Sequence, residues 1–127
     1  MVLIDTSVWI DFLKKVDPYY KIVMGLLMEQ RVVTNSLIFG ELLQGVRNKR
    51  EKEMLLEFWS NLPKTKEEHL ALKAGIYSNE QKLYSKGVGL IDCMILVSAL
   101  ENGYRLATKD KKLAKVVPYN SKFSLAI

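Results

Sequence analysis

The sequence has only one cysteine, Cys93, and one histidine, His69, and this scarcity excludes several kinds of site. A single cysteine allows no internal disulfide, which is typical of proteins that work in a reducing compartment. His69 lies in a run of charged residues, and we interpret it as a surface side chain. A ribonuclease mechanism that uses two histidines is therefore impossible, and a zinc site of histidine and cysteine ligands is not expected. A serine–histidine–aspartate triad is not expected either, because the pattern Gly-x-Ser-x-Gly is absent.

Long apolar runs and phosphate-binding loops are also missing. The longest stretch without a charged residue covers nine residues, 32–40, whereas a transmembrane helix needs about 20 apolar residues. The sequence has no basic region before its first apolar run, and Asp5 interrupts that run early, so we do not expect a secretory signal. No glycine-rich loop leads into Lys-Ser or Lys-Thr. We therefore expect a cytoplasmic protein without a membrane segment.

The composition predicts one globular domain over residues 1–127, because 49% of the residues are apolar and 26% are charged. The formal net charge of +5 is unevenly distributed. Residues 1–104 are neutral, whereas the segment from Arg105 onward holds six basic residues against Asp110 alone. Such a segment would attract a polyanion through its phosphates, although a basic surface that only keeps the protein soluble is an equally good interpretation.

Short apolar runs alternate with segments of helical spacing, which predicts alternating strands and helices. The expected strands are 2–4, 31–34, 104–108 and 123–127, with 61–64 as a loop or a short edge strand. The expected helices are 6–15, 18–30, 36–48, 50–60, 66–86 and 90–101, with a short helical turn at 111–115. This order predicts an α/β fold with a mostly parallel central sheet of about four to five strands and helices on both faces.

Four acidic residues stand out against this pattern. Asp5 follows the first strand and Asp110 follows the third, so both would lie at the carboxyl-end edge of a parallel sheet, where ligands bind in such folds. Asp92 is the only charged residue within 87–100, and Glu41 is flanked by apolar residues. An ionised carboxylate in apolar surroundings is costly unless it is paired or binds a cation.

Each acid also has an ordinary structural interpretation. Asp5 and Asp92 could cap helices, and Asp110 could stabilise a turn. Glu41 could form an ion pair on a helix surface. If all four share one edge, however, their repulsion must be offset by protonation, by a nearby lysine or arginine, or by a divalent cation. Oxygen ligands alone select Mg²⁺ or Mn²⁺ over zinc. Neighbouring hydroxyls could hold water on such an ion or orient a carboxylate, and they belong to Thr6, Ser7 and Thr108.

Four motifs, in this order, resemble those of a known family. They are Val-Leu-Ile-Asp-Thr-Ser-Val-Trp at 2–9, Glu-Leu-Leu-Gln-Gly at 41–45, Asp-Cys-Met-Ile-Leu-Val-Ser-Ala at 92–99, and Thr-Lys-Asp at 108–110. In these motifs the chain is similar to PIN-domain ribonucleases, in particular to the small VapC-type toxins of toxin–antitoxin pairs. Because the motifs run from the first residues to Asp110, the resemblance covers nearly the whole chain.

The resemblance implies a single PIN domain that acts as a metal-dependent endoribonuclease toxin. It implies that Asp5, Glu41 and Asp92 hold Mg²⁺ or Mn²⁺, directly or through water, with Asp110 assisting. It also implies an RNA substrate, a VapB-type antitoxin that covers the active-site groove, and a homodimer. The RNA backbone would contact the basic residues Lys109, Lys111, Lys112 and Lys115. The antitoxin groove would use aromatic side chains that could otherwise pack in the core, namely Trp9, Phe12, Tyr19 and Tyr20.

Two other functions stay open at the level of the sequence. Asp5 could be the covalent nucleophile of a phosphoryl-transfer protein, although the second aspartate expected two residues later is replaced by Ser7. Alternatively, the acids could form only salt bridges in a non-catalytic module that binds RNA or protein. Uptake of Mn²⁺ at the acids would distinguish the metal-dependent nuclease from such a module.

Overall fold

Three short parallel strands form the centre of the protein. The computed structural model describes residues 1–124. The strands are β1 (Val2–Ile4), β2 (Val32–Val33) and β3 (Arg105–Ala107). The sheet order is β2-β1-β3, and Leu3 lies opposite Val33 on one side and opposite Leu106 on the other. All three residues of the central strand β1 are buried, as expected for a parallel strand that is covered on both faces.

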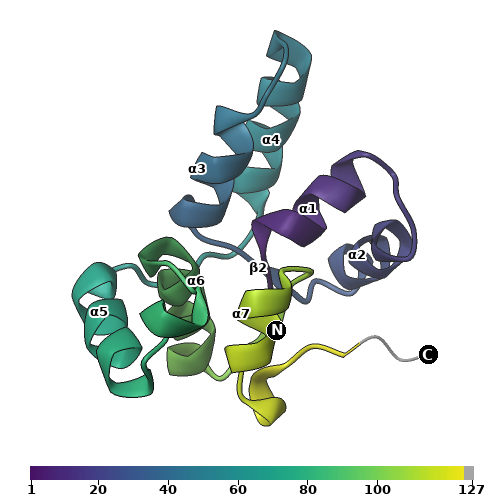
Figure 1. The fold of residues 1–127 in the computed structure, drawn as a ribbon. Helices are drawn as coiled ribbons and strands as arrows, with labels where there is room; N and C mark the ends of the chain where they lie inside the picture. Colours follow the sequence, from purple (N-terminus) through teal and green to yellow (C-terminus); the bar gives the residue numbers. More distant parts are fainter. Residues whose placement is uncertain (125–127) are drawn as a thin grey trace.

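Helices pack around this sheet. Within residues 1–124 the α-helices are α1 (Thr6–Leu13), α2 (Tyr19–Met28), α3 (Ser36–Gln44), α4 (Lys49–Asn61), α5 (Leu70–Gln81), α6 (Leu90–Asn102) and α7 (Lys111–Val116). Two short 3-10 helices are η1 (Tyr84–Lys86) and η2 (Tyr119–Ser121). In Figure 1 the α1–α2 pair lies to the right of the centre, the α5–α6 pair lies to the left, and the α3–α4 pair projects above them. In the described part of the chain, no helix has the length and apolar character needed to cross a membrane.

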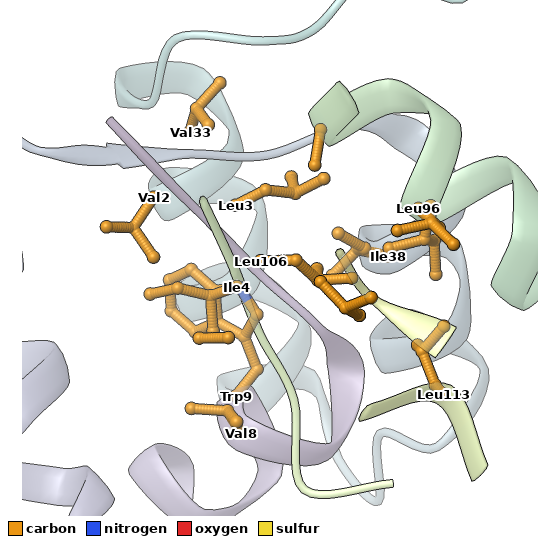
Figure 2. Packing of buried hydrophobic residues seen from close by; sticks show 14 of the residues in the cluster. Val2, Leu3, Ile4, Val8, Trp9, Val33, Ile38, Leu96, Leu106 and Leu113 are labelled. Atoms are coloured by element: carbon orange, nitrogen blue, oxygen red, sulfur yellow. The ribbon is translucent and has the colours of Figure 1, made fainter. Parts of the chain in front are cut away.

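Buried apolar side chains fill the space on both faces of the sheet. Figure 2 shows Ile4 on the same side of β1 as Trp9, and Leu3 on the other side, toward Ile38 and Leu96. This alternation follows from the strand geometry, because successive side chains point to opposite faces. Trp9 belongs to α1, whereas Ile38 and Leu96 belong to α3 and α6, so helices cover both faces of the sheet as predicted.

Polar side chains begin the helices that lead away from the sheet edge. Asp5 caps α1, Asn35 caps α3 and Asp110 caps α7, each through a side-chain oxygen that accepts backbone N–H groups. A cap of this kind stabilises a helix by about 1 kcal/mol. Glycine instead ends a helix at the C-terminus of α6. This helix stops at Gly103, whose φ of 67° lies in the left-handed region that glycine adopts without strain.

The predicted α/β fold with a parallel sheet is confirmed, but the expected four to five strands are wrong. The described residues form three strands, because two further segments contribute only single bridges, Thr34 to Lys64 and Leu106 to Lys122. The segment 61–64 is too short for a strand because α4 continues to Asn61. The strand expected at 123–127 is represented by one hydrogen bond from the N–H of Phe123 to the carbonyl of Leu106, at 3.1 Å. Residues 125–127 lie outside the described residues.

The helix predicted over 66–86 is also shorter in the structure, where α5 covers only Leu70–Gln81. His69 and Lys82 flank it with φ angles of 54° and 56°. A residue in this left-handed conformation cannot continue a right-handed helix, so each of them ends the regular hydrogen-bond pattern. At 111–115, the predicted helical turn is a helix of its own, α7.

Candidate active site

The candidate site lies where β1 and β3 end side by side. Asp5 directly follows β1, and the loop 108–110 directly follows β3. The backbone N–H of Asp5 donates to the carbonyl of Ala107 at 2.9 Å, which joins the two strand ends. Glu41 comes from α3, and Asp92 comes from the first turn of α6. Four separate elements therefore supply the acidic residues that the sequence singled out.

Asp5 is buried, with 5% of its surface exposed, and hydrogen bonds hold both of its carboxylate oxygens. Oδ1 accepts the backbone N–H of Thr6 at 2.8 Å. Oδ2 accepts two hydroxyl groups, from Ser7 at 3.0 Å and from Thr108 at 2.7 Å. Three donors offset part of the cost of removing a carboxylate from water, and they fix its orientation. Asp5 therefore caps α1 and also presents a fixed carboxylate at the sheet edge.

The same two hydroxyls also hold the loop that follows β3. Ser7 Oγ accepts the backbone N–H of Lys109 at 3.0 Å. Thr108 Oγ1 accepts the backbone N–H of Asp110 at 3.1 Å. Each hydroxyl thus donates to Asp5 and accepts from the loop, so α1, β3 and the start of α7 form one hydrogen-bonded unit. The structure places Ser7 and Thr108 beside the acids, and their contacts position Asp5.

Asp110 and Glu41 are each anchored through one oxygen. Oδ1 of Asp110 accepts the backbone N–H groups of Lys112 at 2.9 Å and Leu113 at 3.1 Å, which caps α7. Oε1 of Glu41, an exposed residue, accepts the hydroxyl of Thr6 at 2.7 Å. The sequence suggested a turn residue at Asp110, whereas the structure shows a helix cap, which leaves the second oxygen of Asp110 without a hydrogen bond among the described residues. The contact with Thr6 ties α3 to the start of α1.

Asp92 differs from the other three acids because no hydrogen bond to its carboxylate is found within residues 1–124. It is half-buried in the first turn of α6, and Gly89 rather than Asp92 occupies the cap position of that helix. Burial raises the pKa of Asp92 from its ordinary value of 3.8 to about 6, with further contributions from the charges of Asp5, Asp110 and Glu41. These three acids are therefore close enough to Asp92 for their charges to act on it.

The chemistry of this donor set fits Mg²⁺ or Mn²⁺. In the part of the chain that the structure describes, none of Asp5, Glu41, Asp92 and Asp110 forms an ion pair. Four carboxylates without a basic partner leave a negative charge that a divalent cation would offset. Among the same residues, no three acidic, histidine or cysteine side chains form a ready-made metal site. Mg²⁺ does not need one, because it keeps several waters and binds through one or two carboxylates.

Sequence reasoning missed one charged residue beside this site, Asp11. Its Oδ2 lies 2.6 Å from Nζ of Lys109, and the Asp11 side chain is only 14% exposed. The helical position gave a signal, because Asp11 follows Ser7 by four residues and so shares its face of α1. Lys109 was predicted to contact RNA, but its ammonium is paired with Asp11 in this structure. The other predicted lysines are exposed on α7, and they are Lys111, Lys112 and Lys115.

Trp9 requires a correction, because it does not contribute to an accessible groove. It is fully buried, and its ring meets those of Phe12 and Phe39 edge-on, with centroids 5.6 and 5.4 Å away. Trp9 and its neighbour Val8 are the buried residues of α1, so the Trp9 side chain offers no surface to a partner. Phe12, Tyr19 and Tyr20 are half-buried.

Two apolar grooves are lined by other residues. A groove of about 800 Å³ runs between the end of α2 and α4, and its apolar lining includes Leu27, Val32, Met54, Phe58 and Leu62. A second groove of about 340 Å³ lies between α1, α3 and α4, and it reaches Glu41. Neither groove is lined by Trp9, Phe12, Tyr19 or Tyr20.

The order of the acids along the chain and their meeting at one sheet edge can be compared with known proteins. A sequence model of the PIN domain family matches residues 2–117. The chain belongs to the PIN domain family. The resemblance inferred from the four motifs is thereby confirmed. This PIN domain is 32% identical over 118 residues to the protein named ribonuclease VapC32 from Mycobacterium tuberculosis, found in two strains, and the match covers 89% of this chain and 87% of the relative.

Two solved structures share the fold of this PIN domain. VapBC2 from Rickettsia felis, crystallised with a DNA fragment from its promoter, matches with a TM-score of 0.65 and 23% identity over 98% of both chains. FitAcB from Neisseria gonorrhoeae matches with a TM-score of 0.58 and 20% identity, over 89% of this chain and 90% of the other. At such identities the likeness concerns the fold alone.

Proposed function

We propose that this PIN domain is a VapC-type endoribonuclease toxin that acts in the cytoplasm and hydrolyses RNA with bound Mg²⁺ or Mn²⁺. The observation that supports the proposal is that Asp5, Glu41 and Asp110 lie close enough to Asp92 for their charges to act on it, while no ion pair neutralises any of the four acids within residues 1–124. The kinship with a protein named as a ribonuclease supports the same reaction class. Together they favour phosphodiester hydrolysis over a structural role for the acids.

The side chains of Asp5, Glu41 and Asp92 would hold the ion, directly or through water, with Asp110 assisting. When bound, such an ion lowers the pKa of a water molecule, polarises the scissile phosphate and stabilises the leaving oxygen. Ser7 and Thr108 keep the Asp5 carboxylate in one orientation. Hydrolysis by water would leave a 5′-phosphate and a 3′-hydroxyl.

The exposed lysines of α7 would hold the RNA backbone beside the acids. Asp110 caps this helix, so Lys111 and Lys112 lie in its first turn, next to the site. Lys115 follows one turn later. Contacts of ammonium groups with phosphates provide affinity but little selection of bases. The proposed role of these lysines is therefore to fix the position of the RNA strand. The choice of RNA would depend on other features.

The same proposal includes two protein partners, a VapB-type antitoxin and a second copy of this chain. The antitoxin would cover an apolar groove, for which the surface between α2 and α4 offers the larger volume, about 800 Å³. The homodimer would use exposed apolar residues of α5, where Leu72 and Ile76 are 66% and 55% exposed. Leu72 and Ile76 are four residues apart and share one face of α5, and exposed apolar side chains that lie together are typical of a protein contact.

A cleavage assay with a metal-free control tests the proposed function. The purified protein should cut a 5′-labelled RNA with Mg²⁺ or Mn²⁺, and EDTA should stop the reaction. Asp5→Asn and Asp92→Asn should lose about a hundredfold or more in rate, because mutation of residues that only orient metal ligands already costs about ten- to a hundredfold. Asp17→Asn is the matched control, since Asp17 forms an exposed ion pair with Lys21 outside the site. Cleavage that persists in EDTA or in both site variants would refute the proposal.

The assay also addresses the aspartyl-phosphate alternative. Both carboxylate oxygens of Asp5 accept hydrogen bonds, which lowers their availability as a nucleophile. No observation on this chain favours a phosphoryl-enzyme over hydrolysis by water. Beryllofluoride bound to Asp5 without any RNA cleavage would nevertheless favour it.

A further inference from the structure

Lys109 is held at two points by successive turns of α1. Its backbone N–H donates to Ser7 Oγ at 3.0 Å, and its ammonium pairs with Asp11 Oδ2 at 2.6 Å. Ser7 and Asp11 are four residues apart and so lie on one face of the helix, one turn from each other. The side chain of Lys109 therefore runs along α1, from the acids at its start toward its middle.

The two partners of this pair differ in exposure. The Asp11 side chain is 14% exposed and that of Lys109 is 43% exposed. Tyr19, the first residue of α2, lies close enough for both charges to act on it: burial raises the pKa of Tyr19, the Lys109 charge lowers it and the Asp11 charge raises it. A charge-assisted hydrogen bond is stronger than a neutral one.

Without Asp11, the ammonium of Lys109 could reach the acids. Its two neighbours in the loop, Thr108 and Asp110, belong to the hydrogen-bonded unit around Asp5. The backbone nitrogen of Lys109 is two hydrogen bonds, through Ser7 Oγ, from the Asp5 carboxylate. A lysine side chain is long and flexible enough to span that separation.

We propose that Asp11 is a positioning residue that holds the Lys109 ammonium away from the four carboxylates, so that their charge stays available to a divalent cation. This inference rests on the proposed function. A released ammonium would pair with the carboxylates and offset the same negative charge that the cation needs. Asp11 thus acts through Lys109, without contact with the ion or with RNA.

A double-mutant cycle on Mn²⁺ binding tests this role without any activity assay. The dissociation constant for Mn²⁺ is measured by isothermal titration for the wild type, Asp11→Asn, Lys109→Gln and the double variant. We expect Asp11→Asn to weaken Mn²⁺ binding about tenfold in the wild-type background, and less than about twofold in the Lys109→Gln background. Asp17→Asn removes the same charge elsewhere and should change binding less than about twofold.

Three results would overturn the inference. An unchanged dissociation constant in Asp11→Asn would mean that Lys109 does not compete with the ion. If Asp11→Asn weakened Mn²⁺ binding equally in both backgrounds, Asp11 would act through its own charge. An effect that depends on Lys109 must disappear in Lys109→Gln. No Mn²⁺ binding by the wild type would refute the proposed metal site as well as this role. Thermal unfolding confirms that each variant is folded, and Asp11→Ser replaces Asp11→Asn if the latter is not.

Discussion

Asp92→Asn is expected to stabilise the metal-free protein near neutral pH, although it should abolish RNA cleavage. The half-buried carboxyl of Asp92 has its pKa raised from 3.8 to about 6 by burial and by three neighbouring acids. A shift of this size corresponds to about 3 kcal/mol between the protonated and ionised forms. Because the side chain is still partly in contact with water, screening reduces the expected cost to about 1–2 kcal/mol.

The sign of the pH dependence follows from the raised pKa. Below pH 3.8 the carboxyl of Asp92 is protonated in the folded and the unfolded protein, so it costs no stability. Above about pH 6 it is ionised in both, and the folded protein bears the whole cost. The contribution of Asp92 to the free energy of unfolding should therefore fall as pH rises through this window. Asparagine has nearly the same shape and no charge, so the variant should lack this component.

Urea denaturation in EDTA, followed by circular dichroism at several pH values from 4 to 8, measures this difference. The free energy of unfolding of Asp92→Asn minus that of the wild type should grow from near zero at pH 4 to about 1–2 kcal/mol at pH 7. Asp17→Asn, which removes an exposed acid paired with Lys21, should show no such growth. The reasoning would be refuted if Asp92→Asn were less stable than the wild type at pH 7, or if the difference did not change with pH.

Two further predictions concern the hydroxyl contacts and the lysines of α7. Thr108→Val removes a donor to Asp5 and an acceptor for the loop, so it should lower the free energy of unfolding by about 1–2 kcal/mol in urea denaturation, and wild-type stability would contradict the role of the hydroxyl. Replacing Lys111, Lys112 and Lys115 by glutamine should reduce the salt dependence of single-stranded RNA binding, the slope of log K against log salt, by about 2 in a fluorescence anisotropy titration. An unchanged slope would mean that α7 does not contact phosphates.

The sequence was sufficient for the parts of the fold that depend on local signals. The apolar run at 2–4 ends at Asp5, and it became a buried central strand whose end carries that acid. Asn35, a residue type that favours the cap position, stands directly before the expected helix at 36–48, and its side chain accepts the N–H of Ile38. Gly103 stands just after the expected helix at 90–101, and it ends α6 with a left-handed φ. In each case a single residue type has few alternatives at that point of the chain.

Other features depend on contacts between distant segments, and the sequence could not give them. Trp9 and Phe12 are both aromatic residues of α1, and the sequence does not distinguish them. Packing against Phe39 and the sheet buries Trp9. The ion pair of Asp11 with Lys109 joins residues that are far apart in the chain. The short edge strand that 61–64 could have formed is missing for a similar reason. Because α4 continues to Asn61, only Lys64 is left to pair with the sheet, as a single bridge.

The acids at the sheet edge illustrate two ways in which a folded protein accommodates a carboxylate. Asp5 receives three hydrogen-bond donors, so its burial is compatible with stability even without a cation. Asp92 receives none within residues 1–124, and it faces three like charges whose repulsion no described ion pair relieves. On the proposed function, the free energy that Asp92 costs the metal-free protein is released when a cation binds. The same substitution that stabilises the metal-free protein, Asp92→Asn, should therefore reduce the stabilisation by Mn²⁺, because a ligand stabilises the folded state only through its affinity for it.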